Sequence, residues 1–149
     1  MTKEEERLLL EDLSGRLSCE VIIQVYFEDI SADGYFDEEL WSLELDGESV
    51  RVNDRWIENI KPYLRPISSM TEEEKDKLFD ILQIDKDGNT EDWIRINGVM
   101  GIRFFFPAGK YVEDIIEAYD YLNSIHIDYR GLIGKGLALE APKNMYKND

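Results

Sequence analysis

Two pairs of alternating apolar runs, each meeting at a short turn sequence, most constrain the fold of this chain. The first pair flanks Asp46-Gly47 and the second pair flanks Asn97-Gly98. These dipeptides readily adopt the positive φ angles of tight hairpins, and alternation places the apolar side chains of a strand on one face. The sequence therefore predicts two β-hairpins, and antiparallel sheet forms a large part of the expected fold.

More β-structure is expected around the first hairpin. Residues 19–27 are rich in β-branched and aromatic side chains, and residues 56–60 read as a further strand. Between them, Ala32-Asp33-Gly34 is typical of a turn, and residues 37–39 are three acids that we place in a loop. We therefore expect an antiparallel meander, which could curl into a small SH3-like barrel.

Helices are predicted in three places. Thr2 with Glu5, and Thr71 with Glu74, match the capping box that begins a helix, and apolar residues follow each at helical spacing. A third apolar helical face follows the second hairpin. The expected order is a helix over 1–17, the meander over 19–66, a helix over 71–83, a hairpin over 91–106, a helix over 110–125, and a segment over 126–149 that frays after residue 142.

Length and composition favour one folded domain. The chain has 149 residues, of which 43% are hydrophobic and 11% aromatic, enough to bury a core without disulfides. We expect a single α+β domain over residues 1–149, with three main helices packed against the sheets.

The charge of the chain is strongly acidic. Asp and Glu number 33 against 17 Lys and Arg, which gives a net charge of −16. Contacts to phosphate need an excess of cations, so direct nucleic-acid binding and docking to an anionic membrane are disfavoured. The acids concentrate in residues 28–54 and 71–92. These stretches are either solvated faces or a surface that mimics nucleic-acid phosphates and occupies a basic groove of another protein.

Residues 51–65 reverse this trend and supply a candidate ligand site. Its members are Arg51, Arg55, Trp56, Lys61, Tyr63 and Arg65. Guanidinium groups pair well with phosphate and aromatic rings stack on bases, so this composition predicts a small anion or nucleotide pocket. The alternative is a strand with ordinary outward cations.

A second candidate site lies near the C-terminus. Tyr121, Tyr129 and Arg130 have the composition of a protein-interface hot spot. The competing interpretation is packing within the chain.

Catalytic and metal signatures are weak. Cys19 and His126 are each the single residue of their type, no catalytic motif surrounds either, and we expect a buried apolar cysteine and a structural histidine near a helix end. Residues 85–89 hint at a calcium loop, but Gly88 occupies the wrong position, which favours a solvated turn. We expect no cofactor, no metal site and no enzyme activity.

No segment at the N-terminus resembles a signal peptide, and no apolar run approaches the ~18 residues of a membrane span. We therefore expect an intracellular, reducing environment.

Two stretches of sequence carry a family resemblance. They are Ile60-Lys61-Pro62-Tyr63-Leu64-Arg65-Pro66 with Ser68-Ser69-Met70-Thr71-Glu72-Glu73-Glu74, and the region from Asp120-Tyr121-Leu122-Asn123-Ser124 through Gly136-Leu137-Ala138-Leu139-Glu140-Ala141-Pro142. Together they resemble a widespread family of small proteins from phages and prophages of gut Bacteroidales bacteria. The resemblance implies a phage or mobile-element origin and a host-cytoplasm setting, and it brings no catalytic residue to this chain.

Three functions follow from the sequence, in order of preference. The first is a non-enzymatic accessory protein that engages a host or phage protein through its acidic surface. The second is a small-ligand or nucleotide binder that uses the 51–65 residues. The third is an enzyme with a carboxylate-based site.

Overall fold

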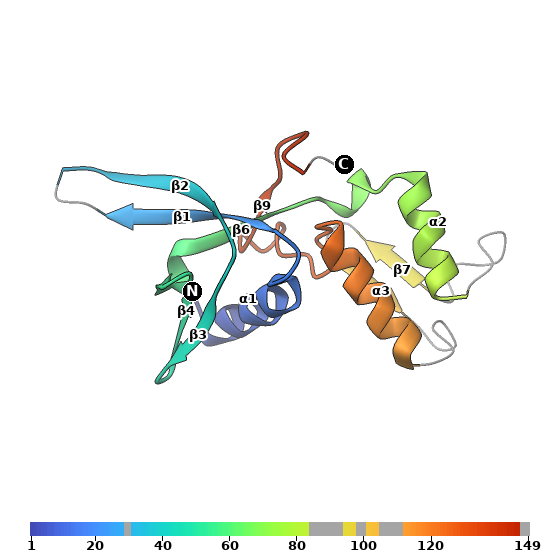
Figure 1. Ribbon diagram of the computed structural model, residues 1–149, viewed down its shortest axis with the longest axis horizontal. Helices are drawn as coiled ribbons and strands as arrows, with labels where there is room; N and C mark the ends of the chain where they lie inside the picture. The colour runs from blue at the N-terminus through green and yellow to red at the C-terminus, as the bar shows by residue number, and fades with distance from the viewer. Residues whose placement is uncertain (29–30, 84–93, 98–100, 105–111, 147–149) are drawn as a thin grey trace. The chain divides into compact units, whose positions relative to one another are not determined.

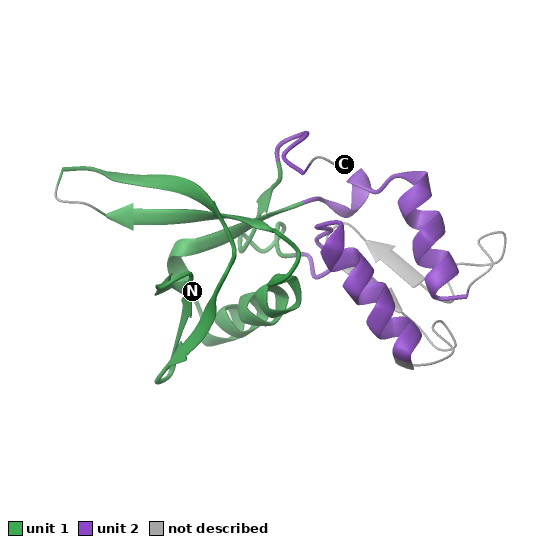
Figure 2. Cartoon of the chain, in the orientation of Figure 1, with its two compact units in different colours: residues 1–64, 132–141 green, residues 65–131, 142–149 purple. Residues whose placement is uncertain are grey.

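The computed structural model describes residues 1–28, 31–83, 94–97, 101–104 and 112–146. The chain has an α+β fold, in which three α-helices accompany several small sheets within this described part (Figure 1). It divides into two compact units, shown in Figure 2. Unit 1 comprises residues 1–64 and 132–141, and unit 2 comprises residues 65–131 and 142–149. The prediction that both belong to a single domain stays a prediction.

Unit 1 contains one α-helix and two sheets. Its elements are α1 (Lys3–Arg16), β1 (Ile22–Glu28), β2 (Asp33–Glu39), β3 (Leu43–Asp46), β4 (Ser49–Val52), β5 (Arg55–Trp56), the 3-10 helix η1 (Ile57–Asn59), β6 (Ile60–Leu64) and β9 (Leu139–Glu140). One sheet has the order β2-β1-β6-β9 and the other has the order β3-β4-β5. The expected meander is thus split between two sheets, and the strands described here do not close an SH3-like barrel.

The predicted hairpin at Asp46-Gly47 is confirmed. β3 and β4 pair antiparallel, and Gly47 has a φ of 66°, which a residue with a Cβ adopts at a cost. A second tight turn follows at once, because Asn53 and Asp54 have φ angles of 51° and 64° between β4 and β5. Two successive positive φ angles are typical of a type I′ hairpin turn.

β2 corrects two sequence interpretations. Asp33 and Gly34 lie inside this strand and do not form a turn, and residues 37–39 are strand residues and not a loop. Every residue of β2 pairs with β1, and the burial of β2 alternates between exposed and half-buried. Pairing with a β-rich neighbour therefore makes a strand of a polar segment, in which Asp33, Asp37 and Glu39 occupy the exposed face and Glu38 lies on the half-buried face.

The core of unit 1 forms between α1 and the strands. The capping box at Thr2 and Glu5 is confirmed, and Leu9 and Leu13 of α1 are fully buried. β1 contributes Ile23 and Val25 to the buried set, and residues 132–138 add Leu132, Leu137 and Ala138 from much later in the chain. Unit 1 is therefore completed by a segment that returns after unit 2.

Unit 2 packs two helices and a hairpin. Its elements are the 3-10 helix η2 (Ile67–Ser69), α2 (Glu72–Ile81), β7 (Ile94–Asn97), β8 (Gly101–Phe104) and α3 (Val112–Ser124). β7 and β8 pair antiparallel as predicted, although the turn residues 98–100 lie outside the described residues. Its core includes Leu78 from α2, Ile102 from β8 and Leu122 from α3.

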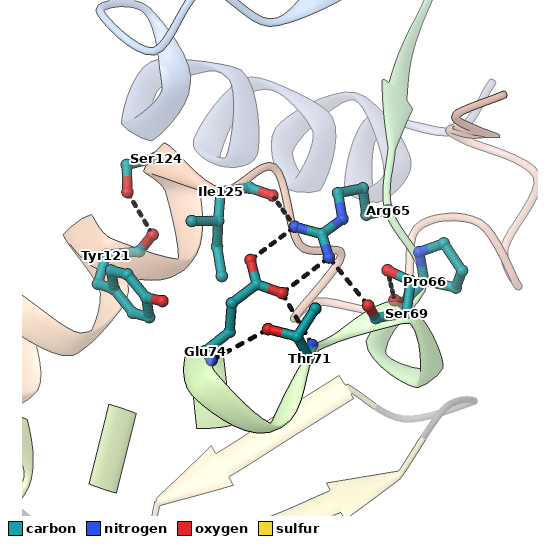
Figure 3. A network of polar contacts seen from close by, with 8 residues as sticks. All are labelled: Arg65, Pro66, Ser69, Thr71, Glu74, Tyr121, Ser124 and Ile125. Atoms are coloured by element: carbon teal, nitrogen blue, oxygen red, sulfur yellow. Dashed lines mark hydrogen bonds and ion pairs between the residues drawn. The ribbon is translucent and has the colours of Figure 1, made fainter. Parts of the chain in front are cut away.

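A buried arginine ties the start of unit 2 together (Figure 3). Arg65 is 4% exposed, and its guanidinium donates to both carboxylate oxygens of Glu74 at 2.8 Å. It also donates to the carbonyl oxygens of Ile125 at 3.1 Å and Ser69 at 2.9 Å. Burial raises the pKa of Glu74, but its hydrogen bonds with Arg65 and Thr71 outweigh burial and hold that pKa below its ordinary value.

The described end of the chain is packed and not frayed. Tyr146 is 7% exposed, and its ring stacks on His126 at a centroid distance of 3.7 Å. The sequence predicts fraying after residue 142, but the aromatic side chain of Tyr146 is buried. None of the helices in the described part of the chain is long and apolar enough to cross a bilayer.

Candidate functional site

An open groove with a volume of about 720 Å³ lies in unit 1. Its walls come from the end of β1, the β4–β5 turn and η1. The groove exists because β6 stops pairing with β1 at Val25, opposite Ile60, while β1 continues to Glu28. The chain before β6 turns away as η1, which leaves space beside the last residues of β1.

Two exposed tryptophans line this groove. Trp41 is 61% exposed and Trp56 is 42% exposed. Water contact of a large aromatic surface is unfavourable, and exposed aromatic patches commonly mark places where another molecule binds. Phe27 of β1 adds a third apolar ring to the lining. The groove therefore offers aromatic surface for contact with a ligand or partner.

Asn53 holds Trp41 in place. Its side-chain oxygen accepts hydrogen bonds from the backbone N–H groups of Trp41 at 2.8 Å and Ser42 at 3.0 Å. Its amide nitrogen donates to the backbone oxygen of Glu39 at 2.8 Å and to Oε1 of Glu38 at 3.1 Å. The amide is 4% exposed and satisfied on both sides, so the connection between β2 and β3 is fixed to the β4–β5 turn.

Two arginines of the groove already cover aromatic rings. The register of β4 and β5 places Arg51 opposite Trp56, and the guanidinium carbon lies 4.6 Å from the ring centroid. Arg55 lies 4.9 Å from the ring centroid of Phe36 on β2. These cation–π contacts stabilise the lining of the groove.

Carboxylates outnumber arginines in the lining. The lining contains four acids, Glu28, Glu38, Asp54 and Glu58, against two arginines, Arg51 and Arg55. The formal charge of the lining is therefore negative, in line with the net charge of the chain. A cationic group gains from both the carboxylates and the faces of the aromatic rings, whereas a phosphate group meets repulsion from four acids.

The six predicted ligand residues do not all meet. Arg51, Arg55 and Trp56 line the groove, and Lys61 and Tyr63 lie on β6 and are not part of its lining. Arg65 belongs to unit 2 and is committed to Glu74.

Tyr63 is engaged within the sheet. Its hydroxyl donates to Asp37 at 2.9 Å and accepts from the amide of Gln24 at 3.3 Å. Burial first, and then the hydrogen bond to Asp37, raise the pKa of Tyr63. The residue thus joins β6 to β1 and β2.

The predicted interface residues near the C-terminus are engaged within unit 2. Tyr129 is 5% exposed, and its ring lies 5.1 Å from that of Tyr119, so it is a core residue. Arg130 covers the Tyr129 ring at 5.2 Å, and Lys77 covers the half-buried Tyr121 ring at 4.9 Å. Packing within the chain, the competing interpretation, accounts for these contacts.

Cys19 and His126 lie in different units. Cys19 follows α1 in a turn and is half-buried, so it neither opens β1 nor is fully buried as expected. His126 lies just after α3 with a φ of 64° and stacks on Tyr146, which fits the expected structural role. Within the described ranges, no group of three or more His, Cys, Asp or Glu residues could hold a metal ion, and residues 85–89 lie outside them.

Sequence reasoning missed Trp41 and Asn53 as site residues. The available signal was the Asn53-Asp54 pair between two β-forming segments, because asparagine tolerates positive φ and favours tight turns.

Comparisons with protein-family models, curated proteins and solved structures found no match to this chain.

Proposed function

We propose that this chain is a non-enzymatic phage or mobile-element accessory protein that acts in the host cytoplasm by binding a partner protein. The groove of unit 1 receives a partner segment that carries Lys or Arg. The observation that carries this proposal is the combination of Trp41 and Trp56, both exposed, with an excess of carboxylates in one groove.

The chemistry of the groove favours a peptide over a compact anion. A Lys or Arg side chain has an apolar stem that packs on indole rings and a charged head that pairs with Glu or Asp. Desolvation of aromatic surface supplies affinity, and charge complementarity supplies specificity and a faster encounter. The partner is therefore a basic, extended or loop segment of a host or phage protein.

A peptide titration tests the proposal. The probe is acetyl-Lys-Val-Lys-Val-Lys-amide, and its counterpart replaces every Lys with Glu. Fluorescence of Trp41 and Trp56 reports binding in a Trp93→Phe background, because Trp93 is the third tryptophan of the chain. The basic peptide should bind and the acidic peptide should not, and binding should weaken with added salt.

Matched variants locate the site. Trp41→Ala should reduce affinity about tenfold or more, as loss of an aromatic anchor does, whereas Leu45→Ala should not. Leu45 is a suitable control because it is 75% exposed and lies outside the groove lining. Glu58→Lys should likewise weaken binding more than Glu48→Lys, whose side chain is exposed outside the lining. Equal effects within both pairs would rule the groove out.

A nucleotide is the second candidate ligand, because Arg51, Arg55 and Trp56 line the same groove. A thermal-shift screen with mono-, di- and cyclic nucleotides distinguishes it. A rise in melting temperature that Arg55→Gln abolishes would favour the nucleotide, and no shift at millimolar ligand would remove it. A carboxylate-based enzyme remains the least favoured prediction.

A further inference from the structure

The groove contains an open strand edge. All seven residues of β1 (Ile22–Glu28) pair with β2, but only Ile23, Gln24 and Val25 pair with β6 on the other side. In the described sheet, residues 26–28 of β1 therefore have a neighbour strand on one edge only. In Figure 1 the β1–β2 ribbon extends away from the other elements of unit 1.

The register shows what is missing beside residues 26–28. If β6 continued backward in line, Asn59 would pair with Tyr26 and Glu58 would pair with Phe27. These two residues belong to η1 instead, and both line the groove together with Tyr26 and Phe27. The groove thus occupies the place of a strand that the chain itself does not provide.

A two-stranded ribbon is a weak structure by itself. Isolated pairs of strands are marginally stable in water, and a strand with open N–H and C=O groups readily accepts another chain. The ends of β1 and β2 have little burial to compensate, because Tyr35 is 65% exposed opposite Tyr26. A third strand beside residues 26–28 would satisfy backbone groups and cover aromatic surface.

We infer that the partner segment binds as a β-strand, in line with β6, along the open edge of residues 26–28 of β1. The inference rests on the proposed function, since it specifies how the groove holds its basic segment. Strand side chains alternate in direction, so Lys or Arg at every second position of the segment lies on one face of the sheet, and we place these cations on the face that Glu38 shares with Phe27. Glu58 of η1 lines the same groove, whereas Glu28 lies on the opposite face of the sheet. Backbone pairing supplies affinity, and this spacing of charges supplies specificity.

A second copy of this chain is a poor occupant. Its β2, an edge strand of the same sheet, carries Asp33, Asp37, Glu38 and Glu39, whereas the arginine-bearing strands β7 and β8 already pair with each other in unit 2. Like charges opposite one another destabilise a strand pair, and the groove already holds more acids than arginines. Charge complementarity therefore selects a basic strand from a different protein.

N-methylated probes test the inference. Two derivatives of acetyl-Lys-Val-Lys-Val-Lys-amide carry N-methyl groups either on every Lys or on every Val. The N–H groups of alternate residues point to opposite edges of a strand, so only one methylation frame blocks pairing with β1. We expect one of the two methylated peptides to lose about tenfold or more in affinity, which corresponds to one or two hydrogen bonds. The other methylated peptide should bind as the unmodified peptide does.

Hydrogen exchange of the full chain supplies the second readout. Bound peptide should slow exchange of at least one backbone amide among residues 26–28. Equal affinity of both frames, or protection confined to Asp33–Glu39 of β2, would overturn the strand inference while peptide binding in the groove stands. No binding of the unmodified peptide would instead overturn the proposed function itself.

Discussion

Asn53 combines a φ of 51° with a buried amide that joins three segments of unit 1. Its side chain bonds to the backbone of Glu39, Trp41 and Ser42, so one residue sets both the β4–β5 turn and the approach to β3. The position of Trp41 in the groove therefore depends on a side chain that does not need to touch a partner.

Two substitutions of Asn53 separate the contribution of its side-chain hydrogen bonds to stability from the contribution of its backbone conformation. Asn53→Gly keeps the positive φ accessible and removes the hydrogen bonds, so we expect a loss of roughly 2–4 kcal/mol in the free energy of unfolding. Asn53→Ala should lose about a further 1 kcal/mol, because a Cβ disfavours the left-handed region. Urea unfolding followed by tryptophan fluorescence measures both, and a glycine variant as stable as the parent would contradict the assignment.

The Arg65–Glu74 pair predicts an acid-sensitive contribution to stability. Because the pKa of Glu74 is lowered in the folded state, the stabilisation is present above its unfolded value of about 4.3 and is lost as pH falls through the folded value. Glu74→Gln should destabilise unit 2 by roughly 2–4 kcal/mol at pH 7, because it leaves a buried guanidinium without its anion. The difference in the free energy of unfolding between the parent and Glu74→Gln should decrease as pH falls below about 4.3.

Glu73→Gln is the control for that experiment. Glu73 lies in the same first turn of α2 but is exposed, so its loss should cost no more than about 1 kcal/mol. Urea midpoints measured between neutral and acidic pH give the comparison. A constant gap between parent and Glu74→Gln at every pH would contradict the ion pair as its cause.

At the scale of elements, the sequence predicted correctly those features that depend on residues close to one another along the chain. The capping boxes at Thr2 and Thr71 and the turn at Gly47 form as predicted, because each depends on residues within a few positions of one another. β2 was missed because its acids resemble a loop until β1 pairs with them. β9 was missed because it pairs parallel with β6, from which it is far removed in sequence.

In the candidate site, too, the sequence predicts what neighbouring residues determine and not what distant residues determine. Arg51, Arg55 and Trp56 line one groove because β4 and β5 are joined by a tight turn. Arg65 follows in the same basic stretch, yet Glu74 binds it in unit 2, and no local pattern indicates that partner. The open edge of β1 is likewise invisible in the sequence, because it depends on where β6 stops.

Helix α1 contains a buried ion pair whose contribution to stability can be tested by substitution. Asp12 and Arg16 are fully buried, and the guanidinium donates to both carboxylate oxygens at 2.8 and 3.0 Å. Asp12→Leu alone should cost roughly 3–5 kcal/mol, because it removes the anion that pairs with the buried Arg16. The double variant Asp12→Leu with Arg16→Met should recover most of that loss, since apolar side chains of similar size can replace a buried pair.

Thermal unfolding of the parent, the two single variants and the double variant gives the coupling between the residues. A double variant whose loss equals the sum of both single losses would show that the pair acts through separate contacts. Arg7 with Glu11 on the exposed side of the same helix is the comparison pair, and exposed pairs of this kind contribute less than about 1 kcal/mol.

At the scale of the whole molecule, the chain passes between its units more than once. Unit 1 takes residues 1–64 and then residues 132–141, which return after unit 2. Parallel strands cannot be joined by a tight turn, and β9 lies parallel to β6, so a crossover must carry the chain between them. Unit 2 supplies most of that crossover.

This arrangement predicts that residues 1–64 do not fold alone. The fragment lacks Leu132, Leu137 and Ala138, whose burial contributes roughly 4–7 kcal/mol together, and that loss is comparable to the ~5–15 kcal/mol stability of a typical domain. Joining residues 1–64 to residues 132–141 through a flexible Gly-Ser linker of about ten residues should restore the fold, because it returns the buried side chains and β9. Dispersion of amide signals in nuclear magnetic resonance spectra distinguishes the two chains. A well-dispersed spectrum from the short fragment would show that the returning segment is dispensable, whereas a folded linked chain that binds the basic peptide would place the entire groove within unit 1.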